Sequence, residues 1–394
     1  MRPALSSRNA CTHRKECSEL LSALNCAPLV SPGHRRSIRQ PTLGNRRKRK
    51  EPTLSRIGPG KCNASSSICL QESTDANIPK EKTLPGGVKE GYWMWRGHRI
   101  RYHRCGDCGP PVVLVHGFGG NCDHWRKNLP VLGLKCRTFA VDLLGYGYSD
   151  KPSPKDLGVN KLYSFETWAR QLLDFTAHFV AEEAAFLICN SVGGIAGLQA
   201  AVDAPGRVAG VQLLDVSLRM LHTKKQAAWQ RPLVTAFQRL LRETQLGKWF
   251  FATIAKPDNI KSVLQECYGN KEAVTSELVD YILKPGLEPG AVEVFLDFIS
   301  YSGGPLPEEL LPQMSSPVSI LWGEADPWEP IELGRAYADY DCVEEFIPLP
   351  GVGHCPMDEA PEQVNPRVLA FVERHSSLKV VDMASRKDPN LQAS

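Results

Sequence analysis

The sequence lacks several features that mark whole classes of protein. No run of about 20 apolar residues is present, the length a helix needs to span a bilayer, so we expect any membrane association to be peripheral. It has neither a cluster of metal-ligating residues nor a dinucleotide-binding fingerprint, so we expect no cofactor and no metal. The 13 cysteines are odd in number and scattered, which argues against a disulfide framework. Cys105 and Cys108 form one isolated Cys-x-x-Cys pair, for which we expect a plain turn, with redox sensitivity as the alternative.

The first 62 residues have very few acidic side chains. They contain 14 Lys or Arg against 3 Asp or Glu, and they lack the apolar segment of a secretory signal. This composition, rich in Ser, Pro and Arg, indicates an organelle transit peptide, with chloroplast favoured slightly over mitochondrion. The alternatives are a nucleic-acid or nuclear-localisation patch at 46–50, or the basic arm of a cytosolic protein. The rest of the chain has 33 basic and 40 acidic residues, so we expect no nucleic-acid partner.

A glycine-rich turn around Ser191 follows a short apolar strand at 185–189. A helix of small residues comes directly after it, which is the layout of a nucleophile elbow. Such a turn exposes the serine Oγ and directs the N–H of the next residue, Val192, towards a developing oxyanion. Cys189 stands where the usual pattern has glycine, and its small side chain fits the same turn.

Three further segments have the order and spacing that this turn requires. The strand at 112–116 runs into a glycine-rich loop, from which we expect Phe118 to supply a second oxyanion N–H. Asp326 follows one later strand, and His354 follows the next. The order serine, acid, histidine is typical of α/β-hydrolases and predicts a catalytic triad of Ser191, Asp326 and His354.

Other polar residues near these motifs have different expected roles. Asp215, at the end of a strand, and Glu324 stay open as alternative acids. His116 is expected to brace its own loop, and Asp142 to organise the loop that follows it.

Apolar strands alternate with amphipathic helices along most of the chain. This alternation predicts an α/β-hydrolase fold, a doubly wound, mostly parallel sheet with the reactive groups beyond the carboxyl ends of its strands. The expected strands are 92–103, 112–116, 137–141, 185–189, 208–214, 318–322 and 344–349. The expected helices include 165–180, 329–340 and 362–375.

The alternation stops between 217 and 312, where the pattern becomes helical and predicts an inserted cap. Apolar residues recur at helical spacing at Leu233, Phe237, Leu240 and Leu241, and at Val292, Phe295, Leu296 and Ile299. We expect most of them to seat the cap on the core, while the surplus at 246–255 is compatible with an apolar substrate or a membrane surface. The predicted division is transit peptide 1–62, lead-in 63–87, core 88–216, cap 217–312, core 313–375 and polar tail 376–394.

Several cap and C-terminal motifs resemble those of plant chlorophyll dephytylases and, more distantly, pheophytinases. They lie at 218–222, 285–292, 301–307 and 326–332, and the Cys-Asn-Ser-x-Gly-Gly elbow belongs to the same resemblance, which covers about residues 88–375. The resemblance implies a chloroplast hydrolase, peripheral on the thylakoid membrane. It implies cleavage of the ester that joins phytol to the ring propionate of chlorophyll or pheophytin.

Other functions of the same fold stay open at this point. A serine hydrolase acting on another carboxylic ester would carry the same triad, and a receptor-type member would bind a small ligand with little turnover. A carbon–carbon bond hydrolase is a further alternative. Epoxide hydrolases and haloalkane dehalogenases are disfavoured, because Ser191 stands where they need an aspartate.

Overall fold

A computed structural model describes residues 79–154, 157, 161–220 and 222–387, with the backbone alone for 377–387. The predicted transit peptide, residues 63–78 of the lead-in and residues 388–394 of the tail lie outside the described residues.

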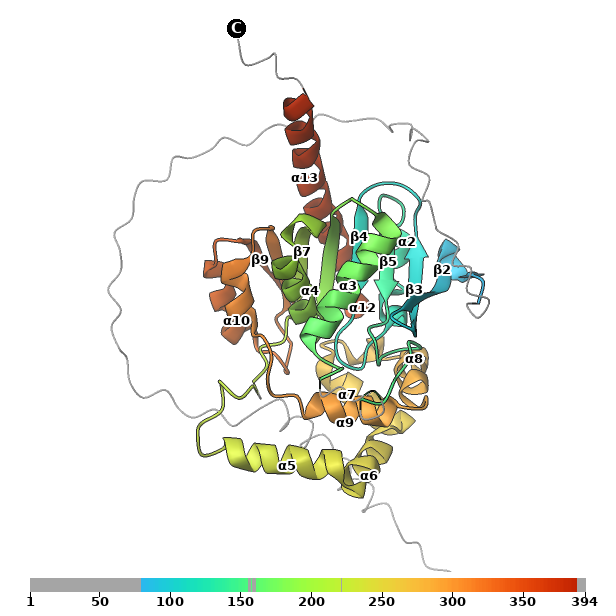
Figure 1. Ribbon diagram of the computed structural model, residues 1–394, viewed down its shortest axis with the longest axis vertical. Coiled ribbons are helices and arrows are strands. Elements are labelled where there is room, and N and C mark those ends of the chain that lie inside the picture. Colours follow the sequence, from blue (N-terminus) through green and yellow to red (C-terminus); the bar gives the residue numbers. More distant parts are fainter. Residues whose placement is uncertain (1–78, 155–156, 158–160, 221, 388–394) are drawn as a thin grey trace, which may run out of the picture.

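A single sheet of nine strands forms the centre of the described chain (Figure 1). The strands are β1 Lys82–Thr83, β2 Lys89–Trp95, β3 His98–Cys105, β4 Pro111–Val115, β5 Arg137–Val141, β6 Ala185–Asn190, β7 Val208–Leu214, β8 Val318–Gly323 and β9 Val343–Leu349. Their order is β1-β2-β3-β5-β4-β6-β7-β8-β9. Pairing is antiparallel from β1 through β3 to β5 and parallel for every later pair, so the sheet is mostly parallel as predicted.

Both faces of this sheet are covered, which confirms the predicted doubly wound fold. Along β4, Val113 and Val115 point into a core shared with α3 (Phe165–Val180) and α4 (Val192–Asp203). Val112 and Leu114 point into a second core, shared with α2 (Leu129–Leu132), α12 (Pro356–Glu359) and α13 (Pro361–Lys387). Alternate residues of one strand therefore serve two apolar layers, and such strands read as continuous apolar runs.

The segment 92–103, predicted as one strand, is a hairpin of β2 and β3. A two-residue turn at Arg96 and Gly97 separates them, with φ of 50° and 83°. Two successive positive φ angles match the twist of a tight hairpin, and only Gly97 takes its angle without strain. The prediction of a single strand was wrong because it passed over the Arg96-Gly97 pair, where the apolar alternation breaks and resumes at Ile100.

Two helices also differ from their predicted bounds. The expected helix at 329–340 is the short α11 (Ile331–Gly334) followed by a 3-10 turn, since Gly334 weakens the helix and packs against Trp322. The expected helix at 362–375 is α13, which continues to Lys387 because no Gly or Pro ends it after residue 375. The remaining helix of the core, α10 (Pro307–Leu310), precedes β8.

Five helices lie between β7 and α10, in the segment where the sequence predicts helical structure. They are α5 Arg231–Glu243, α6 Gln245–Ile254, α7 Pro257–Cys267, α8 Ser276–Gly286 and α9 Ala291–Ile299. In Figure 1 α7 and α9 lie towards the sheet, whereas α5 and α6 form the end of the cap farthest from it. Helix α5 packs on α6 and α9.

The apolar stripe of α5 does not seat the cap on the core as predicted. Leu241 is buried, but Leu233, Phe237 and Leu240 are 63%, 38% and 45% exposed. The prediction was wrong for these three because α5 is in an outer layer, where only one side of the helix has a partner.

Candidate active site

Ser191 lies in a strained turn between β6 and α4. Its φ and ψ are 53° and −124°, outside the regions that a serine ordinarily occupies. The backbone N–H of Ser191 donates to the carbonyl of Leu214 at 3.0 Å, which ties the turn to the end of β7. Strain of this kind persists only where the surrounding contacts enforce it, and it is typical of functional turns.

Two glycines let the loop after β4 approach this turn closely. A Cβ on Gly117 would lie 2.8 Å from the Cβ of Ser191, and one on Gly193 would lie 2.4 Å from the carbonyl oxygen of His116. Any larger residue at either position would push the loop away from the serine. The small residues of the elbow therefore serve close packing, as the sequence indicates.

Ser191, His354 and Asp326 form one hydrogen-bonded chain, although 163 residues separate the first two. His354 Nε2 is 2.9 Å from Ser191 Oγ, and His354 Nδ1 is 2.7 Å from Asp326 Oδ2. A carboxylate can only accept, so Nδ1–H donates to Asp326 and Nε2 accepts from the serine hydroxyl. All three residues are buried. The structure thus brings together the three side chains that the sequence singles out.

Asp326 uses its other oxygen to fix its own loop. Oδ1 accepts from the backbone N–H groups of Trp328 and Glu329 at 2.8 and 3.0 Å, so the carboxylate both caps a turn and orients His354. The alternative acids do not reach the histidine: Asp215 Oδ1 accepts from Gly323 N at 2.8 Å, and Glu324 is exposed.

Two residues that sequence reasoning missed hold the histidine loop in place. The N–H of His354 donates to the carbonyl of Cys267, in α7 of the cap, at 2.7 Å. The Asn190 side chain donates to the carbonyls of His354 and Leu214 at 3.0 and 3.2 Å. The only signal for Asn190 in the sequence is its place next to the serine.

Buried carboxyl groups around the histidine change its proton affinity. Burial lowers the pKa of His354, but Asp326, Asp215 and Glu329 outweigh it and raise the pKa above the ordinary value of 6.5. Burial, together with the neighbouring Asp326, raises the pKa of Asp215 well above its usual range. Burial also raises the pKa of Glu329 to about 7. The three carboxyls together therefore favour the protonated form of His354.

The two predicted oxyanion donors lie on the same cavity as Ser191. Phe118 and Val192 both line it, and within the described residues neither backbone N–H donates to a protein acceptor. Val192 opens α4, whose N-terminal dipole favours negative charge at this point. The ring of Phe118 stacks on Phe298 of α9 at 4.9 Å between centroids, which fixes its loop against the cap.

This cavity has a volume of about 310 Å³ and lies between the core and the cap. Its catalytic end holds Ser191 and His354, while its walls are largely apolar, and the apolar wall residues of the cap come from α6, α7, α8 and α9. Wall residues include Phe251, Ile254, Val263, Ile282, Phe295 and Ile299. The site suits a long apolar group attached to a polar reacting centre.

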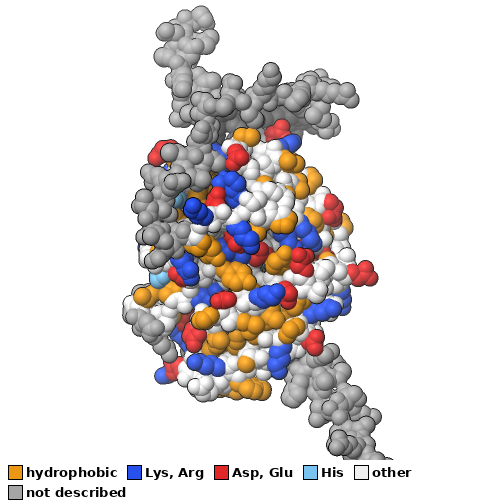
Figure 2. Space-filling model, turned by 90° about the vertical axis from the view of Figure 1, so that its right-hand side faces the viewer, with side chains coloured by type: hydrophobic (Ala, Val, Ile, Leu, Met, Phe, Trp, Pro, Cys, Tyr) orange, Lys and Arg blue, Asp and Glu red, His pale blue; other side chains and the backbone are white. Residues whose placement is uncertain are grey.

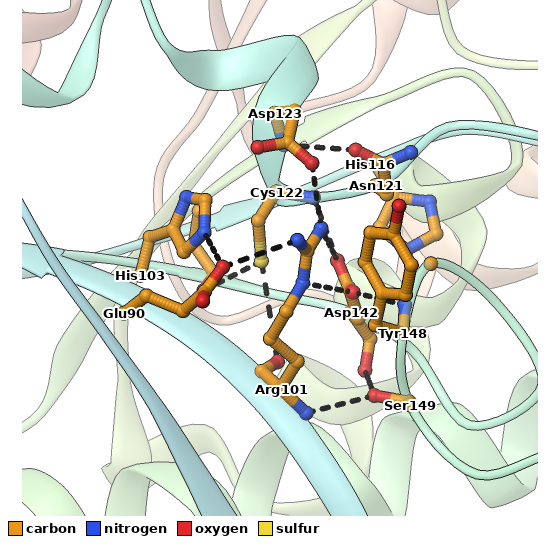
Figure 3. A network of polar contacts seen from close by, with 12 residues as sticks. Glu90, Arg101, His103, His116, Asn121, Cys122, Asp123, Asp142, Tyr148 and Ser149 are labelled. Carbon is orange, nitrogen blue, oxygen red and sulfur yellow. Dashed lines mark hydrogen bonds and ion pairs between the residues drawn. The ribbon is translucent and has the colours of Figure 1, made fainter. Parts of the chain in front are cut away.

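A buried polar network behind the glycine-rich loop fixes its position (Figure 3). Asp142 accepts from Arg101 Nε at 2.7 Å and from the N–H groups of Cys122 and Tyr148 at 2.7 and 2.8 Å. His116 accepts from Leu143 N through Nε2 at 3.1 Å, so its Nδ1–H donates to the Gly117 carbonyl. Both residues organise loops, as predicted, and neither touches Ser191.

Replacing Asp142 by asparagine is expected to destabilise the fold by about 2–3 kcal/mol, because the buried Arg101 guanidinium loses its one fully buried carboxylate and keeps only Glu90 and Asp123. Urea unfolding followed by circular dichroism measures this difference. Asp150→Asn is the matched control, since Asp150 pairs with Arg99 at the surface and should cost about 1 kcal/mol or less. Equal losses for the two variants would contradict the role given to Asp142.

The described residues show no other site of chemistry. Among them, no group of His, Cys, Asp and Glu is arranged to hold a metal ion, and no helix is long and apolar enough to cross a membrane. Cys105 lies at the end of β3 and Cys108 in the bend before β4, and burial raises the pKa of the Cys105 thiol.

Comparisons with known proteins agree with this fold. Residues 112–367 match the model of the alpha/beta hydrolase family. One relative is the uncharacterized hydrolase YugF of Bacillus subtilis, which is 26% identical over an alignment that covers 66% of this chain and 89% of YugF. Another is the chloroplastic pheophytinase of Arabidopsis thaliana, which is 26% identical over 73% of this chain and 67% of the pheophytinase. The structure of the epoxide hydrolase CorEH matches with a TM-score of 0.59 at 20% identity, over 73% of this chain and 99% of that one. The chain belongs to the alpha/beta hydrolase family.

Proposed function

We propose that the protein is a serine carboxylic-ester hydrolase that works through a Ser191–His354–Asp326 triad. The observation that carries this proposal is the hydrogen-bonded chain of these residues at one end of an apolar cavity. A hydroxyl held against a buried, carboxylate-oriented imidazole is the arrangement that activates serine as a nucleophile.

The reaction takes two steps. His354 removes the proton from Ser191 as Oγ attacks the ester carbonyl, and then donates it to the leaving alcohol, which gives an acyl-enzyme. Water, deprotonated by the same imidazole, hydrolyses the acyl-enzyme and restores the serine. The N–H groups of Phe118 and Val192 stabilise the oxyanion in both steps, with about 3–4 kcal/mol from each donor.

The substrate that we propose is the phytyl ester of chlorophyll, and of pheophytin as a second substrate. The apolar walls from the cap suit a phytyl chain, and the reacting end beside Ser191 and His354 suits the ester group. Similarity to a pheophytinase and the motifs shared with chlorophyll dephytylases support the same assignment. We further propose a chloroplast location, from the basic, acid-poor N-terminal segment, with peripheral attachment to the thylakoid membrane.

Detergent-dispersed chlorophyll and pheophytin, incubated with the full chain, test this assignment. We expect free phytol and the dephytylated pigment to appear together in the chromatogram, and to be absent with Ser191→Ala. Hydrolysis of short acyl esters without phytol release would keep the serine hydrolase and remove the pigment. Tight pigment binding without turnover of any ester would instead indicate a receptor-type protein.

The dependence of hydrolysis on pH reports the carboxyl groups around the base. Only neutral His354 accepts the serine proton, and its acidic neighbours raise the pKa of His354. We therefore expect kcat/KM to increase with pH, with the midpoint of the increase above pH 6.5. Glu329→Gln removes one of these carboxyls and should lower the midpoint of this increase by roughly one pH unit. The pH profile of short-ester hydrolysis measures both, with Glu332→Gln as a control on an exposed side chain. An unchanged midpoint in the Glu329 variant would contradict the effect of Glu329 on the pKa of His354.

A further inference from the structure

The outer side of the cap exposes an unusual number of large apolar side chains. Six lie within one short stretch, and here they are called the apolar face: Trp229, Leu233, Phe237, Leu240, Leu246 and Trp249. They are 38–69% exposed, and Trp229 and Trp249 exceed 60%. Single exposed apolar residues are normal on a protein surface, but a contiguous group of this kind marks an interaction site.

The apolar face follows from helix geometry. Leu233, Phe237 and Leu240 are four and three residues apart along α5, and this spacing places them on one side of the helix. The buried residues of α5, Gln238 and Leu241, lie on a different side, against the rest of the cap. Leu246 and Trp249 repeat the three-residue spacing on α6, which packs on α5.

Basic side chains surround this face in an otherwise acidic chain. Residues 224–261 contain 8 Lys or Arg and 2 Asp or Glu, although residues 63–394 contain 33 and 40. Lys224, Lys225, Arg242 and Lys248 pair with acids of neighbouring elements, and Arg239 pairs with Glu243 on the same helix. The 8 basic side chains of the segment still outnumber the 6 acids that lie in it or pair with it. Figure 2 shows hydrophobic and basic side chains interspersed at the lower end of the molecule, where Figure 1 places α5 and α6.

The apolar face lies directly outside the substrate cavity. On α6, Leu246 and Trp249 are exposed, whereas Phe251 and Ile254 line the cavity. On α5, Gln238 lines the cavity from the buried side. One layer of helices therefore separates the cavity from the outer surface.

We propose that the apolar face docks on a lipid bilayer with anionic headgroups, with α5 lying in the plane of the interface. Helix α5 has Leu and Phe on one side and Arg on another, with Trp229 just before it and Trp249 on α6, which is the composition of such interfacial helices. The basic surplus favours anionic over neutral lipid. Docking in this orientation places the cap helices that wall the cavity next to the bilayer, so an ester dissolved in the lipid enters without crossing bulk water. This inference rests on the peripheral membrane attachment proposed above and assigns the surface that makes it, and it does not depend on which ester is cleaved.

Vesicle sedimentation with the full chain tests this docking. The face variant is Leu233→Ser/Phe237→Ser/Leu240→Ser, and the control is Val131→Ser/Leu134→Ser/Leu333→Ser, three exposed apolar residues of the core. With vesicles of phosphatidylcholine and phosphatidylglycerol, we expect partitioning of the face variant to fall by at least about tenfold, and that of the control to stay within about twofold of the unmodified chain. The basic N-terminal segment is present in all three proteins, and added salt screens its contribution.

Tryptophan quenching places the face in the lipid independently. Bromine in the acyl chains should quench the unmodified protein, and Trp229→Phe/Trp249→Phe should lose most of this quenching while it still sediments with vesicles. This comparison also decides the matter if circular dichroism shows that the face variant does not fold, because the Phe substitutions keep the surface apolar. Unchanged sedimentation of a folded face variant, or unchanged quenching in the Trp variant, would overturn the proposal. A dimer in solution that the face variant dissociates, without vesicle binding by the unmodified chain, would assign the face to a second copy of this chain instead.

Discussion

Ser191→Ala is expected to lower kcat for ester hydrolysis by roughly five to six orders of magnitude, the loss seen when the nucleophile of a serine triad is removed. The Ser191 hydroxyl lies on the cavity and in hydrogen-bond contact with His354 Nε2, so its loss removes the group that forms the acyl-enzyme. Steady-state hydrolysis of a short acyl ester measures the loss, because it does not require the pigment assignment to be correct.

Folding and substrate binding should survive this change. Alanine has the same Cβ as serine in the strained turn, and the backbone bond from residue 191 to Leu214 does not involve the side chain. Ser319→Ala, which removes a buried hydroxyl of β8 far from the cavity, is the control and should keep most of the activity. An active Ser191→Ala protein would contradict the assignment of the nucleophile.

Asp326→Asn is expected to lower kcat by roughly 10⁴-fold, because an amide at this position no longer favours the Nδ1–H tautomer of His354 or stabilises its protonated form. The same change at Asp215 should cost less than about tenfold. Burial raises the pKa of Asp215 and so favours its neutral form, which asparagine matches closely in charge and shape, and the asparagine carbonyl can still accept from Gly323.

Comparing kcat of these two variants on one ester assigns the acid of the triad. Both carboxyls are buried within the same network, so a nonspecific effect of losing a buried acid should appear in both. An inactive Asp215→Asn protein with an active Asp326→Asn protein would transfer the role to Asp215.

Features encoded locally could be predicted from the sequence. The turn at Ser191 needs small residues next to a strand end, and such a requirement leaves a visible motif. The strands of the parallel sheet read as apolar runs because helices cover both faces, so their places and the order of Ser191, Asp326 and His354 are evident without the structure.

Features that depend on distant contacts could not be predicted in this way. Asn190 and Cys267 hold His354 through its backbone, and a backbone contact imposes no recognisable residue type. Glu329 acts on the base only because the chain folds it beside His354. The prediction that the apolar stripe of α5 packs on the core was wrong because periodicity indicates which side of a helix is apolar, but not whether that side meets the core or the solvent.

The most direct test of the account is covalent labelling of the full chain with a fluorophosphonate, followed by mass spectrometry of its peptides. Phosphonylation requires a serine activated by a base, and it is independent of the natural substrate. We predict one adduct, on Ser191, at a rate that falls sharply in His354→Ala. Failure to label, or labelling of another serine with Ser191 unmodified, would contradict the claim that this residue is an activated nucleophile.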